Sequence, residues 1–301
     1  MKHVQIQNAD MAWHVAANVQ FPPTFDESKQ YPTIISVHPF GSCKEQTSGN
    51  VYGKALAEAG YVVIAYDASF QGESGGSPRW VEDPTQRVED ISRVIDYAVT
   101  LPYVDAERIG VLGICGGGGY AINAALTEKR IKAVVSITGV NIGRLFREGF
   151  SNYDPIGALN AMAAQRTNEA RGGEVQVNEL LPASPEMAKA GGLTDYKTPR
   201  GQQPGGATRM VFSHAQKTLA WDAFAFAEVL LTQPAMVVVG EKTGAFGAYR
   251  DGLEIYGRAV ASRDRQLVSL ADFSHYELYD KPEAVREAMS KVLPFFAAHL
   301  E

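Results

Sequence analysis

The sequence has little of what marks a secreted, membrane-bound or metal-binding protein. Only two of its 301 residues are cysteine, Cys43 and Cys115, too few for a disulfide framework or an unaided zinc site. No apolar run approaches the roughly 18 residues that span a bilayer, and no long apolar segment follows Lys2. We therefore predict a cytoplasmic protein with reduced thiols, without a signal peptide and without membrane association.

A strong excess of charge is also missing. The formal net charge is −6 and no basic stripe is present, so nucleic acid is not an expected partner. The content of 45% hydrophobic and 21% charged residues is typical of a globular protein. Nothing in the sequence calls for a metal or an organic cofactor, and a homo-oligomer stays open.

Short apolar runs alternate with helix-like stretches along most of the chain. Runs typical of buried strands occur at 33–37, 61–66, 108–114, 132–137, 235–240 and 266–270, and two loosely alternating segments precede them at 4–7 and 14–21. Helical spacing occurs at about 50–59, 84–98, 118–127, 248–262 and 282–300. This order predicts an α/β fold whose mostly parallel sheet binds ligands at the carboxyl ends of its strands.

The alternation breaks down between residues 141 and 215. This part contains helix-like pieces at 155–166 and 184–189, followed by a Gly/Pro-rich stretch. A long irregular segment inside a compact domain is usually a lid or a binding insertion. We therefore expect a core made of residues 1–140 and 216–301, interrupted by a lid or cap at 141–215.

The sequence Gly113-Ile114-Cys115-Gly116-Gly117 has the spacing of a nucleophile elbow, with cysteine where serine is more usual. Only very small residues fit two positions before and after a residue in such a strained strand-to-helix turn. The nearby helix N-terminus favours a thiolate. We predict that Cys115 is a nucleophile; the alternative is a glycine-rich turn around a buried cysteine.

A cysteine nucleophile needs a base, and His275 is the best placed of the six histidines because it follows the last predicted strand. Its imidazole either takes the thiol proton during attack or forms a thiolate–imidazolium pair beforehand. The acid that orients this histidine should follow the run 235–240. Glu241 is our choice there, unless Asp251 reaches back from the next helix.

Two backbone amides are predicted to form an oxyanion hole. Pro39 fixes the turn after the run 33–37 and Gly41 permits close backbone approach, so the amide of Phe40 is expected to pair with that of Gly116. For the side chain of His38 we expect a structural hydrogen bond.

Another polar group follows the run 61–66. We expect Asp67 and Arg79 to pair and to hold this loop. Cys43 carries no elbow around it and is interpreted as a bystander near the site.

These blocks resemble the α/β-hydrolase superfamily and, within it, the dienelactone-hydrolase-like group that includes intracellular hydrolases related to polyketide transferases. The resemblance spans nearly the whole chain and is carried by residues 38–41, 67–76, 101–110, 113–118 and 275–280. It implies an eight-stranded, mostly parallel sheet with helices on both faces. It also implies a Cys/Ser–His–acid triad that acts on esters, lactones or thioesters through an acyl-enzyme.

Cys115 and His275 match the positions of that triad, whereas Gly244 stands about where relatives often carry aspartate. We expect a hydrolase of ester, lactone or thioester bonds whose substrate is a small acyl or lactone molecule. An acyltransferase that uses the same acyl-enzyme is one alternative, because the dryness of the lid decides between them. A non-catalytic receptor or scaffold on a hydrolase fold is the other.

Overall fold

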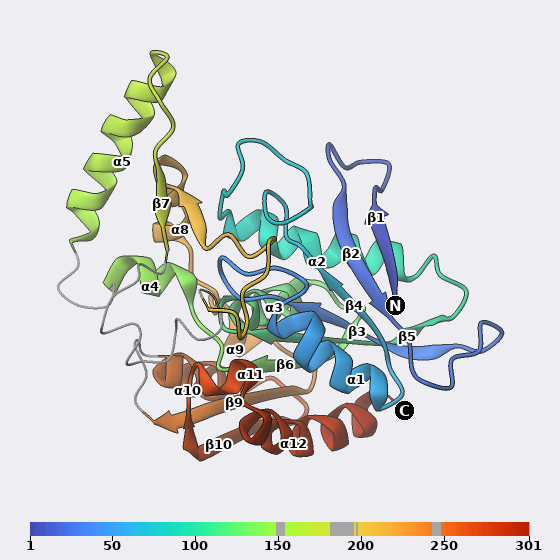
Figure 1. Ribbon diagram of the computed structural model, residues 1–301. Coiled ribbons are helices and arrows are strands. Elements are labelled where there is room, and N and C mark those ends of the chain that lie inside the picture. Colours follow the sequence, from blue (N-terminus) through green and yellow to red (C-terminus); the bar gives the residue numbers. More distant parts are fainter. Residues whose placement is uncertain (149–153, 181–195, 197, 243–247, 301) are drawn as a thin grey trace.

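The chain folds around one eight-stranded sheet in the computed structural model, which describes residues 1–148, 154–180, 196, 198–242 and 248–300 (Figure 1). The strands are β1 (Lys2–Ile6), β2 (Val15–Gln20), β3 (Tyr31–Val37), β4 (Val62–Tyr66), β5 (Val104–Ile114), β6 (Ile131–Ile137), β9 (Ala235–Lys242) and β10 (Arg265–Ser274). Their order is β1-β2-β4-β3-β5-β6-β9-β10. β2 runs antiparallel to β1 and β4, and the other neighbours are parallel. The predicted mostly parallel, eight-stranded sheet is confirmed.

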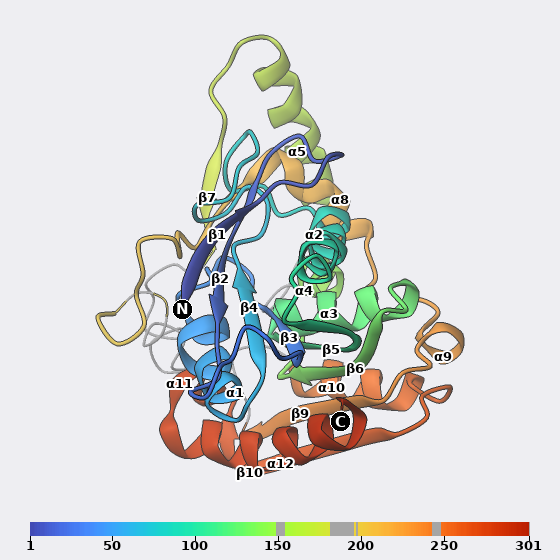
Figure 2. The same cartoon turned by 90° about the vertical axis from the view of Figure 1, so that its right-hand side faces the viewer.

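Helices cover both faces of this sheet (Figures 1 and 2). One face is covered by α1 (Lys54–Glu58) and α12 (Pro282–Leu300). The π-helical turn η1 (Thr47–Gly53) leads into α1, and the short helix α11 (Glu277–Asp280) leads into α12. The other face is covered by α2 (Pro84–Ala98), α3 (Gly116–Thr127) and α10 (Ala248–Arg258). Asp83 caps α2 by accepting the N–H groups of Thr85 and Gln86, as the Asp-Pro pair predicts. None of the described helices has the length and apolar character that crossing a bilayer requires.

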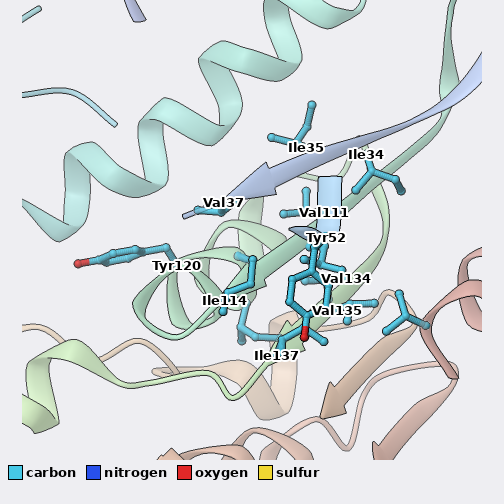
Figure 3. Close-up of a cluster of buried hydrophobic side chains, with 14 of the residues drawn as sticks. Ile34, Ile35, Val37, Tyr52, Val111, Ile114, Tyr120, Val134, Val135 and Ile137 are labelled. Carbon is cyan, nitrogen blue, oxygen red and sulfur yellow. The ribbon is translucent and has the colours of Figure 1, made fainter. Parts of the chain in front are cut away.

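The main core lies around the central strands (Figure 3). Its fully buried members there include Ile34, Ile35 and Val37 of β3, Val111 and Ile114 of β5, Val134, Val135 and Ile137 of β6, together with Tyr52 of η1 and Tyr120 of α3. Successive residues of these strands are apolar because both faces of a parallel sheet are covered. The result is a rigid support from which the loops after β3, β5 and β6 project.

The segment between β6 and β9 contains the predicted lid. Its described elements are α4 (Ile142–Glu148), α5 (Pro155–Ala170), β7 (Val177–Glu179), β8 (Arg209–Val211), η2 (Phe212–Ala215), α8 (Gln216–Ala220) and α9 (Ala227–Leu230). α5 and β7 project away from the sheet (Figure 1). Met162 of α5 forms a second apolar cluster with Met210, Ala215 and Leu219. The helix expected at 155–166 is present as α5, whereas the one expected at 184–189 lies outside the described residues. The lid boundaries stay a prediction.

Candidate active site

Cys115 occupies the sharp turn between β5 and α3. Its backbone has φ 56° and ψ −123°, a sparsely populated region that costs a non-glycine residue of order 1–3 kcal/mol. A Cβ atom on Gly113 would lie 2.1 Å from the carbonyl oxygen of Gly117, and one on Gly117 would lie 2.3 Å from that of Val37. Both positions therefore require glycine, and the sequence forms the tight turn that its spacing predicts.

Cys115 is only 5% exposed, and hydrogen bonding from the backbone N–H groups of Gly116 and Phe40 acts to lower the pKa of its thiol. These are the two amides predicted to form the oxyanion hole, and both act on one sulfur atom. Burial raises the pKa of this thiol to about 11, because the loss of water around a thiolate outweighs the hydrogen bonds it receives. The expectation that the helix terminus would favour a thiolate is therefore overridden by burial.

Buried polar groups hold the loop that carries the Phe40 amide. The N–H of Ala68 donates to Nε2 of His38 at 3.0 Å, and Nη2 of Arg87 donates to the His38 carbonyl oxygen at 2.6 Å. Burial, reinforced by the adjacent Arg87 guanidinium, lowers the pKa of His38 well below its usual value, so its ring is neutral. His38 makes the structural hydrogen bond expected from the sequence.

His275 follows β10 and is 4% exposed. The hydroxyl oxygen of Thr138 lies 2.7 Å from its Nδ1, and that of Tyr279 lies 3.0 Å from its Nε2. Burial lowers the pKa of His275 to about 3, so the imidazole is uncharged at neutral pH. With the thiol of Cys115 also neutral, the resting site favours proton transfer during attack over a preformed ion pair.

Tyr279 joins the two halves of the site. Its hydroxyl lies 3.0 Å from Nε2 of His275, and hydrogen bonding from the same hydroxyl acts to lower the pKa of the Cys115 thiol. The sequence alone assigned no role to Tyr279, although its position four residues after His275 is the spacing that brings side chains together on a helical turn. Thr138 was also missed; its signal is a polar residue directly after the buried strand β6.

The structure does not bring Glu241 to His275. The Glu241 side chain is exposed and accepts a hydrogen bond from the hydroxyl of Ser269 at 2.7 Å. Glu241 lies within the end of β9 rather than in the loop after it, so the strand directs its side chain instead of leaving it free to turn toward the imidazole. Within the described ranges, the hydrogen-bond partners of the imidazole are hydroxyl groups.

The alternative acid, Asp251 on α10, is buried but also points elsewhere. Its carboxylate accepts the N–H of Asn141 at 2.8 Å and pairs with Arg144. Burial raises the pKa of Asp251 to about 6. These contacts hold the segment that begins at Thr138, so Asp251 acts on the site through the loop after β6.

Asp67 pairs with Lys44 rather than with Arg79, contrary to the sequence-based expectation. Nζ of the fully buried Lys44 side chain lies 2.8 Å from Asp67 and 2.7 Å from Glu45. Arg79 instead donates to two backbone carbonyl oxygens of its own loop. Glu45, Asp67 and Cys43 are close enough to hold a metal ion, but the Lys44 ammonium already pairs with both carboxylates, and we assign no metal to this group.

A pocket of about 700 Å³ opens beside the site. Two of its lining residues contact groups described above: the hydroxyl of Tyr196 donates to that of Tyr279 at 3.4 Å, and the N–H of Thr208 donates to the Gly41 carbonyl oxygen at 3.0 Å. Neither Cys115 nor Tyr279 is among the residues that line the pocket. The pocket therefore neighbours the site through Tyr196 and Thr208.

The strand order, the strained turn after β5 and the buried histidine after the last strand define an α/β hydrolase. The family model of the X-Pro dipeptidyl-peptidases (S15 family) matches residues 13–225, and the chain belongs to this family. The function is therefore of the hydrolase type. S15 peptidases are serine hydrolases, whereas the turn of this chain carries Cys115.

Two bacterial relatives match most of the chain. The uncharacterized protein YcjY of Escherichia coli K12 is 43% identical over 94% of this chain and 93% of its own. The uncharacterized protein PA2218 of Pseudomonas aeruginosa is 32% identical over 89% of this chain and 73% of its own. A crystal structure of PA2218 has a TM-score of 0.84 and 28% identity over 99% of this chain and 93% of that chain. The thiohydrolase aneE of Aspergillus aculeatus is 32% identical over 39% of this chain and 36% of its own.

Proposed function

We propose that this protein cleaves carboxylic ester, lactone or thioester bonds through an acyl group carried on Cys115. The observation that supports this most is the environment of the sulfur atom. It sits in a strained turn, and the amides of Phe40 and Gly116 and the Tyr279 hydroxyl, which lies 3.0 Å from His275, all act to lower the pKa of its thiol. A single preorganised donor of this kind stabilises a developing oxyanion by roughly 3 kcal/mol.

The chemistry proceeds in two halves. His275 receives the proton of the thiol, and the sulfur attacks the acyl carbon. The carbonyl oxygen becomes the oxyanion and takes the place of the resting sulfur on the amides of Phe40 and Gly116. Its collapse expels an alcohol or thiol, which takes the proton from the imidazolium. Water then gives a proton to His275 and attacks the thioester, which releases the acid and returns the proton to Cys115.

The leaving group bears on the kind of bond that is cleaved. An amine leaving group must be protonated as it departs. Thiols and activated alcohols are weaker bases and leave with less help. We therefore rank thioesters and activated esters or lactones above peptide bonds.

Three further observations support this proposal. A pocket of about 700 Å³ is in the usual range for small-molecule sites. The partial match to aneE involves a protein described as a thiohydrolase. Cys43 and Cys115 are both free thiols, which suits the reducing cytoplasm in which we place the protein.

The test compares the wild-type protein with Cys115→Ala on an acetyl thioester, on p-nitrophenyl acetate and on an X-Pro p-nitroanilide. We expect turnover of the thioester and the ester, little or none of the anilide, and loss of turnover in Cys115→Ala. Cys43→Ala removes the other buried thiol and should keep the wild-type rate. Unchanged turnover in Cys115→Ala, anilide hydrolysis as fast as thioester hydrolysis, or no turnover of any substrate by the wild type would contradict the proposal.

A further inference from the structure

We infer that Asp251 is a positioning residue for the proposed reaction, which fixes the Thr138 hydroxyl beside the imidazole of His275 through the backbone of residues 138–141. This inference rests on the proposed function, in which His275 is the base. The hydroxyl oxygen of Thr138 lies 2.7 Å from Nδ1 of His275. With the proton of the neutral imidazole on Nδ1, this oxygen accepts it, and Nε2 is the nitrogen that receives a proton during the reaction.

The backbone of Thr138 has a conformation that needs support from its surroundings. Its φ is 44°, in the left-handed region, which a β-branched side chain rarely adopts. Strain of this kind persists only where surrounding contacts hold it, and it is frequent at functional sites. Because the side chain turns with the backbone, relaxation of Thr138 would move its hydroxyl away from the imidazole nitrogen.

Two backbone hydrogen bonds hold the first part of this loop. The N–H of Thr138 donates to the carbonyl oxygen of Val238 on β9 at 2.7 Å, and the N–H of Val140 donates to the carbonyl oxygen of Cys115 at 2.9 Å. The loop is therefore bonded to the backbone of the nucleophile at one residue and to the side chain of the base at another. Its placement decides how these two groups face each other.

Asp251 holds the end of the loop. Its Oδ2 accepts the N–H of Asn141 at 2.8 Å, and its Oδ1 pairs with Arg144. Arg144 also pairs with Glu254 at 2.6 Å, and Asp251 is only 4% exposed. Of the three acceptors that hold the loop backbone, Asp251 is the one that acts through a side chain, so a substitution can remove it.

A second carboxylate on the same residue of the loop provides a matched control. Oδ1 of Asp222 accepts the side-chain N–H of Asn141 at 2.8 Å and the backbone N–H of Phe224 at 3.0 Å. Asp222 therefore binds the Asn141 side chain, whereas Asp251 binds its backbone. Only the loss of Asp251 should release the backbone that carries Thr138.

The experiment compares three variants on p-nitrophenyl acetate. Asp251→Ala should lower kcat by about tenfold, because small displacements of a catalytic group are costly, and should keep KM within about twofold, because the base acts in both halves of the reaction. Asp251→Asn keeps an acceptor for the Asn141 N–H and should recover most of this loss, to within about threefold of the wild type. Asp222→Ala should stay within about twofold. A loss in Asp251→Ala that either of the other two variants equals would overturn the inference.

A double variant tests whether Asp251 acts through Thr138. Thr138→Val/Asp251→Ala should be no slower than Thr138→Val, because no hydroxyl is left to position. Losses that multiply would show that Asp251 acts by another route, and the inference would fail. If Asp251→Ala does not fold because Arg144 has lost its partner, Asp251→Ala/Arg144→Met removes both charges, and Arg144→Met serves as its reference.

The failure of this inference can be told from the failure of the proposed function. If Cys115→Ala is inactive while Asp251→Ala keeps the wild-type rate, the positioning role is overturned and the proposed function stands. If no substrate is turned over, the proton resonance of the His275 Nδ1–H group, assigned by its loss in His275→Gln, provides the test. Its exchange with water should be about tenfold faster in Asp251→Ala than in the wild type or Asp222→Ala, the order expected for one weakened hydrogen bond. Equal exchange rates would overturn the inference.

Discussion

Two groups of buried polar side chains in the described part of the chain can be compared. The charged group consists of Lys44, Asp67, Glu82 and Arg87, and the neutral group consists of Cys115, Thr138, His275 and Tyr279. In the charged group, burial is offset by partners of opposite sign: Lys44 lies 2.8 Å from Asp67, and Arg87 lies 3.7 Å from Glu82. In the neutral group, the described hydrogen-bond partners are uncharged.

The difference separates two tasks. The charged group fixes backbone, since Arg87 donates to the carbonyl oxygen of His38 in the loop that carries the Phe40 amide. Cys115 and His275 of the neutral group stay uncharged, since burial raises the pKa of Cys115 and lowers that of His275. Charge therefore positions the loop with the Phe40 amide, while in the proposed reaction Cys115 and His275 acquire charge only when the acyl group is attacked.

The largest expected effect comes from removing a cation of the charged group, and it is on stability. Arg87→Met leaves the buried Glu82 without its cation and the His38 carbonyl without its donor, and should lower the free energy of unfolding by about 3–5 kcal/mol. Lys132→Met is the matched control, because it breaks an exposed pair with Glu107 at 2.7 Å and should cost at most about 1 kcal/mol. Urea unfolding measures both, and equal losses would contradict the comparison.

Acid should lower the free energy of unfolding of the protein through His275 of the neutral group. The pKa of His275 is about 3 in the folded protein and about 6.5 in the unfolded chain, so the unfolded chain binds the proton first. Stability is full above about pH 6.5 and falls as the pH drops toward 3, by about 2 kcal/mol at pH 5. His275→Gln should remove that part of the loss between pH 8 and 5 in urea unfolding. An identical loss in both proteins would exclude this assignment.

Thr138 should affect rate more than stability. Thr138→Val removes the hydroxyl 2.7 Å from Nδ1 of His275 and should lower kcat by about tenfold, equivalent to ~1.4 kcal/mol. Thr138→Ser keeps the hydroxyl and should stay near the wild-type rate. Equal rates for the valine and serine variants in steady-state assays would show that the hydroxyl does not orient the imidazole.

The smallest expected signal is the ultraviolet absorbance of a Cys115 thiolate. With the pKa of Cys115 raised to about 11, only about one thiol in a thousand is ionised near pH 8. The ultraviolet absorbance of wild type minus Cys115→Ser should therefore show no thiolate step below about pH 9. A step at acidic or neutral pH would mean that the ion pair forms beforehand.

Local sequence rules predicted the parts of this molecule that local geometry determines. Asp83 caps α2 as the pattern indicates, and Gly113 and Gly117 occupy positions where a Cβ atom would clash with backbone. The proposed oxyanion role of the Phe40 amide rests on the same kind of turn argument and stays a prediction. Each of these depends on a few neighbouring residues.

The partners of the histidine depend on contacts between distant segments. Thr138 reaches His275 across 137 positions of the chain, which no spacing rule reveals. Glu241 shows the opposite error: its place after the apolar run was suitable, but the strand continues through it and Ser269 binds its carboxylate. Chain order identifies the segment that should carry an acid, whereas the direction of the side chain decides whether its carboxylate contacts His275.

The resting position of the sulfur has a consequence for substrate affinity. Because hydrogen bonding from the Phe40 and Gly116 amides already acts on the Cys115 thiol in the free protein, every carbonyl group that binds in the proposed oxyanion hole competes with the sulfur for the same donors. This competition weakens the binding of all substrates alike and leaves the step from bound substrate to transition state unaffected.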